Sequence, residues 1–392
     1  MQNYTVTSES VTEGHPDKLC DQISDGILDA YLEQDPLCRV AVETMASKDT
    51  LFIAGEVASR ANVDVPKTAR KIARDIGYTS PESGLDADNC LILTNINTQS
   101  PDIAKGVGLA DGELGAGDQG IMYGFACDES DTYMPYTHHF ATRLCLRLAE
   151  ARKNGQLPWL FPDGKSQVTM AYNANGEPSH ITSVIVSAHH KEGISTDYIR
   201  ECILYEIIYP VIDRDWLHCD TEIFINPTGV FSVGGPLADT GLTGRKIMVD
   251  TYGSVGKHGG GAFSGKDPTK VDRSAAYMAR YVAKQIVAAK LAKKCELTLA
   301  YVIGQPNPKA VAINTYGTEQ IPLDIIHKTL EEEFSFSVRD ILEHLHLREP
   351  RYLKTAAYGH FGREDQGFRW EELDFVSCLC EKAMHELKRR IF

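Results

Sequence analysis

The stretch RVAVETMASKDTLFIAGEVAS, residues 39–59, contains two runs of β-forming residues joined by the polar turn Lys48-Asp49-Thr50. Runs of this kind, bounded by turn residues, are typical of neighbouring strands, so we expect strands at Arg39–Ala46 and Leu51–Ser59. Similar pairs of runs follow twice more along the chain, at Gln167–Tyr172 with Ile181–Ala188 and at Glu296–Ile303 with Ala310–Thr315. The recurrence predicts one structural unit that is repeated three times.

Elements of the same kind flank each strand pair in the same order. In the first unit these are a strand-like run at Tyr4–Ser8, a helix that begins at Pro16 and ends before Pro36, a helix at Pro66–Ile76 and a strand near Cys90–Thr94. The second unit has Ile121–Ala126, Tyr136–Lys153, a helix around Asp197–Tyr209 and Glu222–Ile225, and the third has Lys246–Thr251, Pro268–Ala292 and a helix from Pro322. The predicted order β-α-β-β-α-β is a known arrangement, and each unit has the length of one domain.

The pattern therefore predicts an α+β fold of three similar domains. The 392 residues are 43% hydrophobic and 24% charged, which is typical of a globular chain of several domains. Glycine-rich segments at Gly106–Gly120 and Gly234–Gly244 lie where we expect the domain boundaries.

The composition also disfavours several classes of protein. Forty basic and 54 acidic residues give a net charge of −14, which argues against general binding of nucleic acid. No apolar stretch reaches the length of a membrane span, and the residues after Met1 are polar, so we expect no membrane segment and no secretory signal. The ten cysteines are scattered without a CxxC motif, from which we expect reduced thiols in a cytoplasmic protein.

A basic block coincides with the most glycine-rich stretch of this acidic chain. Arg245–Lys294 contains eleven Lys/Arg and three Asp/Glu, a net charge of +8. Within it, GGGAFSGKD (residues 259–267) lies between the predicted strand Lys246–Thr251 and a predicted helix, with Asp267 as the N-cap and Pro268 at the first helical position. Backbone N–H groups at a helix start, together with a lysine, favour a bound polyphosphate.

The glycine segment is not a standard P-loop. Gly260, Gly265 and Lys266 match GxxxxGK, but the following residue is an aspartate instead of Ser or Thr. Lys266, Lys270, Arg273 and Tyr277 follow one another at three- and four-residue steps. We interpret this side of the predicted helix as facing phosphates, with surface lysines at a helix start as the alternative.

Two further motif matches fail on their context. His258 before three glycines resembles an esterase oxyanion loop, but Ser264 is not part of a GxSxG elbow. GAGDQG (residues 115–120) contains GxGxxG, yet the strand-like run Ile121–Ala126 follows it where a dinucleotide fold needs a helix.

The sequence His15-Pro16-Asp17-Lys18 opens the first long helix. Asp17, Asp21, Asp25 and Asp29 follow at four-residue steps. An acidic residue in a first turn stabilises the helix dipole, whereas a His and an Asp at a helix start also suit a nucleotide and its metal. The residue types leave both interpretations open.

Glu43 and Glu56 lie on strand faces with small or apolar neighbours. If these faces are buried, each carboxylate needs a cation, a donor network or a ligand. The opposite faces, which include Val40, Val42 and Ile53, are at least as apolar, so periodicity leaves the direction of both glutamates open.

Four motifs together resemble the S-adenosylmethionine synthetase (methionine adenosyltransferase) family. They are GHPDK at 14–18, GAGDQG at 115–120, INPTG at 225–229 and GGGAFSGKD at 259–267, and they stand in family order. The resemblance runs from Ser8 to Arg363, nearly the whole chain. It implies three β-α-β-β-α-β domains around a pseudo-threefold axis, at residues 1–100, 114–231 and 233–372, with 99–112 as a mobile lid.

The resemblance also implies a reaction in two stages. The sulfur of L-methionine attacks C5′ of ATP and releases the triphosphate, which is then hydrolysed to pyrophosphate and phosphate. Two Mg²⁺ ions per site and a K⁺ ion are implied as cofactors, and dimers with shared active sites, paired as homotetramers, as the assembly. A sulfur nucleophile has no proton to lose, so no catalytic triad is expected.

The resemblance also implies a role for each residue of this chain that matches a family motif. The resemblance places His15, Lys165, Arg245, Lys246 and Lys266 by the triphosphate, with Asp17 and Asp272 on Mg²⁺ and Glu43 on K⁺. It places Glu56, Gln99, Asp239 and Lys270 by methionine, and Asp163, Phe231, Asp239 and Ala262 by ATP.

One position departs from the family pattern. Val230 stands where we expect arginine, which removes a side-chain contact to ATP there. Two other classes remain: a P-loop-like ATPase or kinase that does not need methionine, and a homologue that binds ATP without turnover. The retained His15, Asp17, Lys266 and Asp272 argue against the second.

Overall fold

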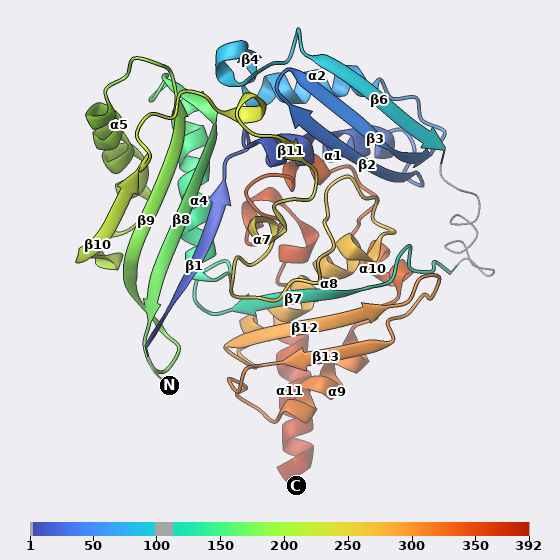
Figure 1. Ribbon diagram of the computed structural model, residues 1–392. Coiled ribbons are helices and arrows are strands. Elements are labelled where there is room, and N and C mark those ends of the chain that lie inside the picture. The colour runs from blue at the N-terminus through green and yellow to red at the C-terminus, as the bar shows by residue number, and fades with distance from the viewer. Residues whose placement is uncertain (1–2, 99–112, 392) are drawn as a thin grey trace.

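The computed structural model describes residues 3–98 and 113–391. The predicted lid at 99–112, which includes the predicted methionine contact Gln99, lies outside these residues. Three sheets of three or four strands form the frame of the described chain (Figure 1).

The predicted strand pairs are confirmed as antiparallel neighbours. They are β2 (Arg39–Ser47) with β3 (Thr50–Ala58), β8 (Leu160–Tyr172) with β9 (Pro178–His190), and β12 (Lys294–Tyr301) with β13 (Ala310–Asn314). Two of the sheets add a parallel strand to the pair: β6 (Leu91–Thr98) beside β3, and β10 (Leu217–Ile225) beside β9.

Each sheet also takes an edge strand from another predicted unit. β1 (Tyr4–Val11) pairs with β8, β7 (Gly120–Cys127) pairs with β12, and β11 (Gly241–Leu242) pairs with β2. The first two units have the expected element order, whereas the third has no strand after Asn314 within the described residues, and the units are not separate along the chain. Alternation of side chains predicts a strand without saying which sheet edge it joins, so this exchange was missed.

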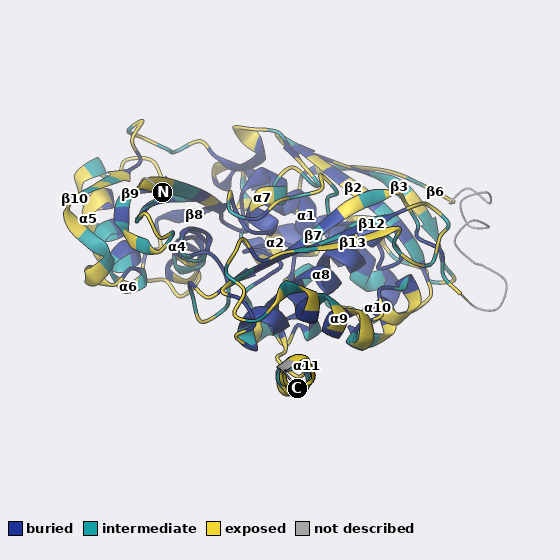
Figure 2. Cartoon of the chain, turned by 90° about the horizontal axis from the view of Figure 1, so that it is seen from below, coloured by how far each residue is buried: buried dark blue, intermediate teal, exposed yellow. Residues whose placement is uncertain are grey.

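One long helix packs against each sheet. α1 (Pro16–Leu32) contacts β2, α4 (Tyr136–Lys153) contacts β8 and β1, and α8 (Val271–Ala288) contacts β7 and β12. α2 (Val65–Ile76) lies beside α1. α1 and α8 are buried along almost their whole length, so they lie inside the molecule between the layers (Figure 2). No helix within residues 3–98 and 113–391 is long and apolar enough to cross a membrane.

The third unit differs from the prediction at its start. Lys246–Thr251 is not a strand, because it contains the short helix α7 (Ile247–Asp250). The first strand of this unit is the two-residue β11. The long helix begins at Val271 with Lys270 as its N-cap, so the predicted N-cap at Asp267 is wrong. Asp267 is engaged elsewhere, because its carboxylate accepts hydrogen bonds from the N–H groups of Val40 (2.8 Å) and Thr269 (2.9 Å).

Other helices differ in extent or were not predicted. The predicted helix Asp197–Tyr209 is α5 (Thr196–Ile203), a π-helical turn at Leu204–Ile208 and α6 (Tyr209–Val211), which contains Pro210. α9 (Leu323–Glu333) confirms the helix expected from Pro322. α10 (Val338–His344) and α11 (Val376–Ile391) were missed.

Candidate active site

His15 caps the start of α1. Its Nδ1 accepts the backbone N–H of Asp17 at 3.1 Å, which satisfies one of the free donors of the first turn. Burial, with the nearby charges of Lys246 and Lys165, lowers the pKa of His15 to about 3. The imidazole is therefore neutral at physiological pH, and because Nδ1 is the acceptor, the proton is on Nε2. His15 thus presents one N–H donor beside two lysines.

Asp17 lies next to β11 and the segment that follows it. Its carboxylate accepts the N–H of Leu242 at 3.0 Å and the ammonium group of Lys246 at 2.6 Å, and the Arg245 guanidinium is 3.6 Å away. Burial opposes ionisation of Asp17, but the hydrogen bonds from Lys246 and Leu242 outweigh it and lower its pKa. A buried, ionised carboxylate with cationic neighbours goes beyond the role of a helix-dipole partner.

The four aspartates of α1 form one row of acceptors. Asp17 holds Leu242, Asp21 accepts the N–H of Gly244 at 2.8 Å, and Asp25 accepts the N–H of Gly265 at 2.8 Å. Asp29 accepts the N–H groups of Tyr352 and Leu353 at 2.9 and 2.8 Å. The helix thereby fixes β11, the glycine segment and a C-terminal loop. The four-residue spacing was visible in the sequence, but its partners were not.

The glycine segment is also fixed to the edge of β2. The Val42 N–H donates to the Gly265 carbonyl at 3.0 Å, and the Asp267 N–H donates to the Val40 carbonyl at 2.9 Å. Gly265 has φ +80°, and a Cβ there would lie 1.9 Å from the Val42 carbonyl oxygen. Only glycine fits this turn without strain.

Arg273 of α8 supports the glycine segment through hydrogen bonds to its backbone carbonyls. Its guanidinium forms a bidentate pair with Asp25 at 2.6 and 2.8 Å and donates to the Phe263 and Lys266 carbonyls at 3.1 and 3.3 Å. Arg273 and Tyr277 are fully buried, so the prediction that they face phosphates is wrong. The Arg273 guanidinium positions the segment from within the core, and the Tyr277 hydroxyl accepts the Arg273 Nε–H at 3.0 Å.

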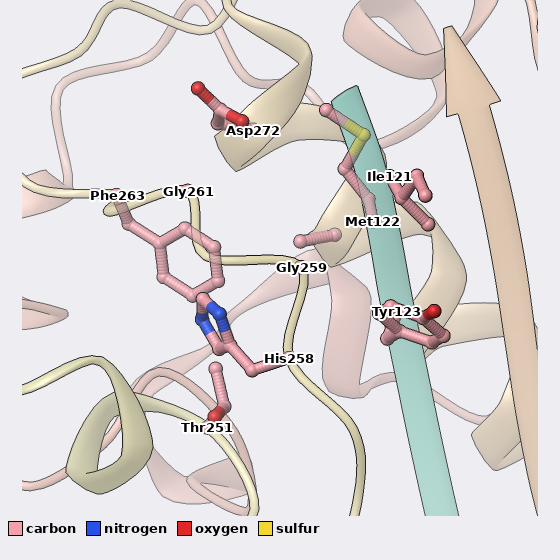
Figure 3. Close-up of a pocket in the computed structure, with 10 residues that line it drawn as sticks. Ile121, Met122, Tyr123, Thr251, His258, Gly259, Gly261, Phe263 and Asp272 are labelled. Carbon is pink, nitrogen blue, oxygen red and sulfur yellow. The ribbon is translucent and has the colours of Figure 1, made fainter.

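Lys266 and Asp272 form an ion pair of 2.8 Å above the glycine segment. A narrow pocket lies between this segment and β7, with Asp272 at its rim and the rings of His258 and Phe263 on one side (Figure 3). A Cβ at Gly261 would lie 2.2 Å from the Asp272 carboxylate, so the backbone can approach this closely only as glycine. Lys270 pairs with Asp267.

Asp163 and its neighbours form a second part of the site. One Asp163 oxygen accepts the Gly235 N–H at 2.9 Å, whereas the other is buried and has no hydrogen-bond partner within the described residues. Burial raises its pKa to about 6, and the nearby Asp239 carboxylate adds to the shift. Phe231 is half-buried against His189, with ring centroids 5.3 Å apart. An unsatisfied buried acceptor suits the amino group of a bound base.

The burial of β2 and β3 shows which face of each strand carries Glu43 and Glu56. Val40, Val42 and Ile53 are buried, while both glutamates are exposed on the opposite face of the sheet, away from α1. The described chain therefore does not bring them to His15 and Asp17. Val230, at the position that departs from the family, is 62% exposed.

Comparison with known proteins decides the family. Residues 3–101, 113–231 and 233–372 match the N-terminal, central and C-terminal domains of S-adenosylmethionine synthetase. The chain belongs to the S-adenosylmethionine synthetase family. The predicted three-domain α+β fold and the predicted enzyme class, a methionine adenosyltransferase, are confirmed by this membership.

Several relatives align over nearly their whole length. The chain is 57% identical to S-adenosylmethionine synthase 1 of Rhodospirillum rubrum over 379 residues, which are 97% of this chain and 98% of that protein. It is 52% identical to the S-adenosylmethionine synthase of Desulforudis audaxviator over 384 residues, which are 95% of this chain and 97% of that protein. Membership in the synthetase family overturns the alternative of a P-loop ATPase or kinase. Residues 243–258, all of them described, also contain no strand that could lead into the glycine segment.

Proposed function

We propose that the chain forms S-adenosylmethionine from ATP and L-methionine by attack of the sulfur on C5′ of ATP. The released triphosphate is then hydrolysed at the same site to pyrophosphate and phosphate. The observation that carries this proposal is the cluster of a neutral His15 donor with Lys246 and Arg245 around the buried Asp17 carboxylate. The same α1 fixes the glycine segment that presents Lys266.

The leaving group sets the chemistry of the site. As the C5′–O bond breaks, negative charge develops on the bridging oxygen, and donors already in place stabilise it most effectively. The Nε2–H of His15 donates to that oxygen without a change of protonation, because its pKa of about 3 keeps the ring neutral. Lys165, Arg245, Lys246 and Lys266 balance the remaining charge of the triphosphate.

The carboxylates fit the predicted Mg²⁺ ions. Mg²⁺ prefers oxygen ligands and is held by one or two carboxylates together with substrate phosphates. Asp17 and Asp272 each form an ion pair with a lysine that we assign to the phosphates. When substrate and metal bind, the lysines would pair with the phosphates and the carboxylates with Mg²⁺. Bound Mg²⁺ supplies charge neutralisation at the phosphate oxygens. We assign two Mg²⁺ per site to Asp17 and Asp272, and K⁺ to Glu43.

The two substrates are assigned to different sets of residues. We assign adenosine to Asp163, Phe231 and Ala262, where the free Asp163 oxygen accepts the adenine amino group. Methionine is assigned to Glu56, Asp239 and Lys270, with Gln99 from the segment outside the described residues. Asp239 is assigned to both substrates, and its carboxylate is near enough to Asp163 to raise the pKa of that group.

The exposed sheet face indicates a second subunit. Leu242, Met45, Phe52 and Leu93 are direct neighbours across β11, β2, β3 and β6, and each is at least one-third exposed. A continuous apolar row on a sheet is typical of a protein interface. We propose that two chains cover this face mutually, which brings Glu43 and Glu56 of one chain to the triphosphate site of the other.

The remaining assignments follow from the family and the topology. The equivalent exchange of an edge strand into each sheet supports a pseudo-threefold relation of three domains at 1–100, 114–231 and 233–372. We further propose pairing of dimers as homotetramers, and a cytoplasmic location. All ten cysteines, each within the described residues, are free, as a reducing compartment favours.

Mass spectrometry of the products tests the proposal. The enzyme is incubated with ATP, methionine, Mg²⁺ and K⁺ in ¹⁸O-labelled water, and we expect S-adenosylmethionine, pyrophosphate and phosphate in equal amounts. The label should enter only the inorganic products, because water attacks the triphosphate and not C5′. Formation of ADP, or phosphate release that does not need methionine, would contradict the reaction, and binding of ATP without products would indicate an inactive homologue.

A further inference from the structure

The start of β10 carries a side-chain cluster that the synthetase reaction does not use. The pairing of β10 with β9 shifts between Leu217 and Glu222, so residues 218–221 form a bulge at the edge of the central sheet. Bulges re-aim side chains away from the regular alternation of a strand. Here His218 and Asp220 of the bulge lie beside His180 of β9.

The three side chains lie close together. The imidazole rings of His180 and His218 are stacked, with centroids 4.3 Å apart and planes inclined by 5°, so one ring has to turn before both direct a nitrogen lone pair at one ion. One ligand atom from each of His180, His218 and Asp220 lies within 4.8 Å of the other two. No other group of three such side chains in residues 3–98 and 113–391 comes as close.

The surroundings hold this cluster in place. Thr221 donates its hydroxyl to the Ile181 carbonyl at 2.6 Å and accepts the His218 N–H at 3.0 Å, so the bulge is fixed to β9 next to His180. Nδ1 of His180 lies 3.1 Å from the Ser179 hydroxyl, which leaves Nε2 of that ring for a ligand. A hydrogen bond to the second ring nitrogen is the usual support of a metal-binding histidine.

The donor set selects a class of metal. Two imidazole nitrogens and one carboxylate suit Zn²⁺ and its neighbours Co²⁺, Ni²⁺ and Cu²⁺, whereas Mg²⁺ and Ca²⁺ prefer oxygen ligands throughout. We propose that His180, His218 and Asp220 form a transition-metal site of the Zn²⁺ class, completed by water, which links the β10 bulge to β9. In Figure 1, β10 is the outer strand of its sheet, on the side away from α1 and α8, so this site is separate from the predicted Mg²⁺ and K⁺ positions.

Zn²⁺ titration of the full chain tests the proposal. Excess Mg²⁺ keeps the Asp17 and Asp272 positions occupied, and the Cys219→Ser background removes the exposed thiol next to the cluster. We expect one equivalent of Zn²⁺ to bind in calorimetry and to raise the midpoint of thermal unfolding. His180→Ala and His218→Ala should each weaken Zn²⁺ binding by at least about 10-fold and abolish the thermal shift.

His385→Ala is the matched control, because it removes an exposed histidine of α11 and should leave the titration unchanged. Co²⁺ supplies a second readout, since the visible absorption of bound Co²⁺ should be lost in both cluster variants and kept in the control. Zn²⁺ affinity that is unchanged in the His180→Ala/His218→Ala double variant would overturn the proposal. Loss of binding with Cys219→Ser alone would overturn it too, because the thiol would then be the ligand.

Discussion

His15 has two separable tasks at the start of α1. Nδ1 caps the helix, and Nε2–H is the donor that we assign to the leaving oxygen. Asparagine is an equally good cap but lacks a donor at the Nε2 position. We therefore expect His15→Asn to keep the stability of the enzyme, and His15→Ala to lose about 1 kcal/mol. Both variants should lose about 10²–10³-fold in turnover. Urea unfolding and steady-state rates check this, and wild-type turnover of His15→Asn would remove the catalytic role.

Lys266 is the lysine that the glycine segment presents beside Asp272. If it stabilises the departing triphosphate, Lys266→Ala should lower turnover by about 10²–10³-fold while ATP binding weakens much less. Lys71→Ala is the matched control, because Lys71 is an exposed lysine of α2 that also pairs with an aspartate and has no assigned role in the reaction. Equal rates for the two variants in single-turnover measurements would show that Lys266 is only a surface lysine.

Asp163 makes stability depend on pH. Its pKa is about 6 in the folded chain, because burial disfavours the charged form, while an unfolded aspartate titrates near pH ~4. Between about pH 4 and pH 6 the folded state keeps a proton that the unfolded state has lost, so the free energy of unfolding falls as pH rises. Asp163→Asn cannot ionise, and its stability relative to wild type should rise across this window. Parallel urea-unfolding profiles of the two proteins would contradict the shift.

At the scale of elements, the contact between the glycine segment and β2 fixes the backbone that presents Lys266 at the proposed phosphate site. Gly260 and Gly265 both have positive φ, but only at Gly265 would a Cβ meet the β2 backbone. Gly260→Ala should therefore cost about 1 kcal/mol from backbone strain alone. Gly265→Ala should cost clearly more and also raise the KM for ATP, because Lys266 is displaced. Thermal unfolding with ATP kinetics checks the pair, and equal losses would mean that the β2 contact is unimportant.

The elements also show what the sequence could predict. The strand pairs and the helices α1, α4 and α9 follow from local periodicity, and the prediction holds for them. The failures are non-local. Lys246–Thr251 has strand-like residues but contains the short helix α7, and the backbone just before it is bonded to Asp17 and Asp21 of α1, 225 and 223 residues away. Arg273 looked like a surface cation because its buried partner, Asp25, is 248 residues away. The site residues were predicted from the family motifs. The alternation of apolar residues did not show whether Glu56 lies on the buried or the exposed face of its strand.

At the scale of the whole molecule, the exchanged strands join the three domains. β1, β7 and β11 each connect one sheet to the chain of another, and α1 binds segments from the C-terminal third of the sequence. The His15 and Asp17 side of the site is therefore assembled from parts far apart in one chain. Glu43 and Glu56 are exposed on the far face of a sheet, so under the proposed function we expect them to act at the site of another chain.

Subunit mixing tests this division of the active site. If His15 and Glu56 act across the dimer interface, a heterodimer of His15→Asn and Glu56→Ala chains has one site with both changes and one intact site. Random reassociation of equal amounts should then restore about a quarter of wild-type turnover, because half of the dimers are mixed and each has one working site. Leu93→Glu places a charge in the apolar row across the sheet, and chains with this change should sediment as inactive monomers. Tyr198→Glu, at a comparably exposed residue of the central domain, is the control that should remain associated. Mixed chains that stay as inactive as either parent would place His15 and Glu56 in the same chain's site, and the exposed face would need another explanation.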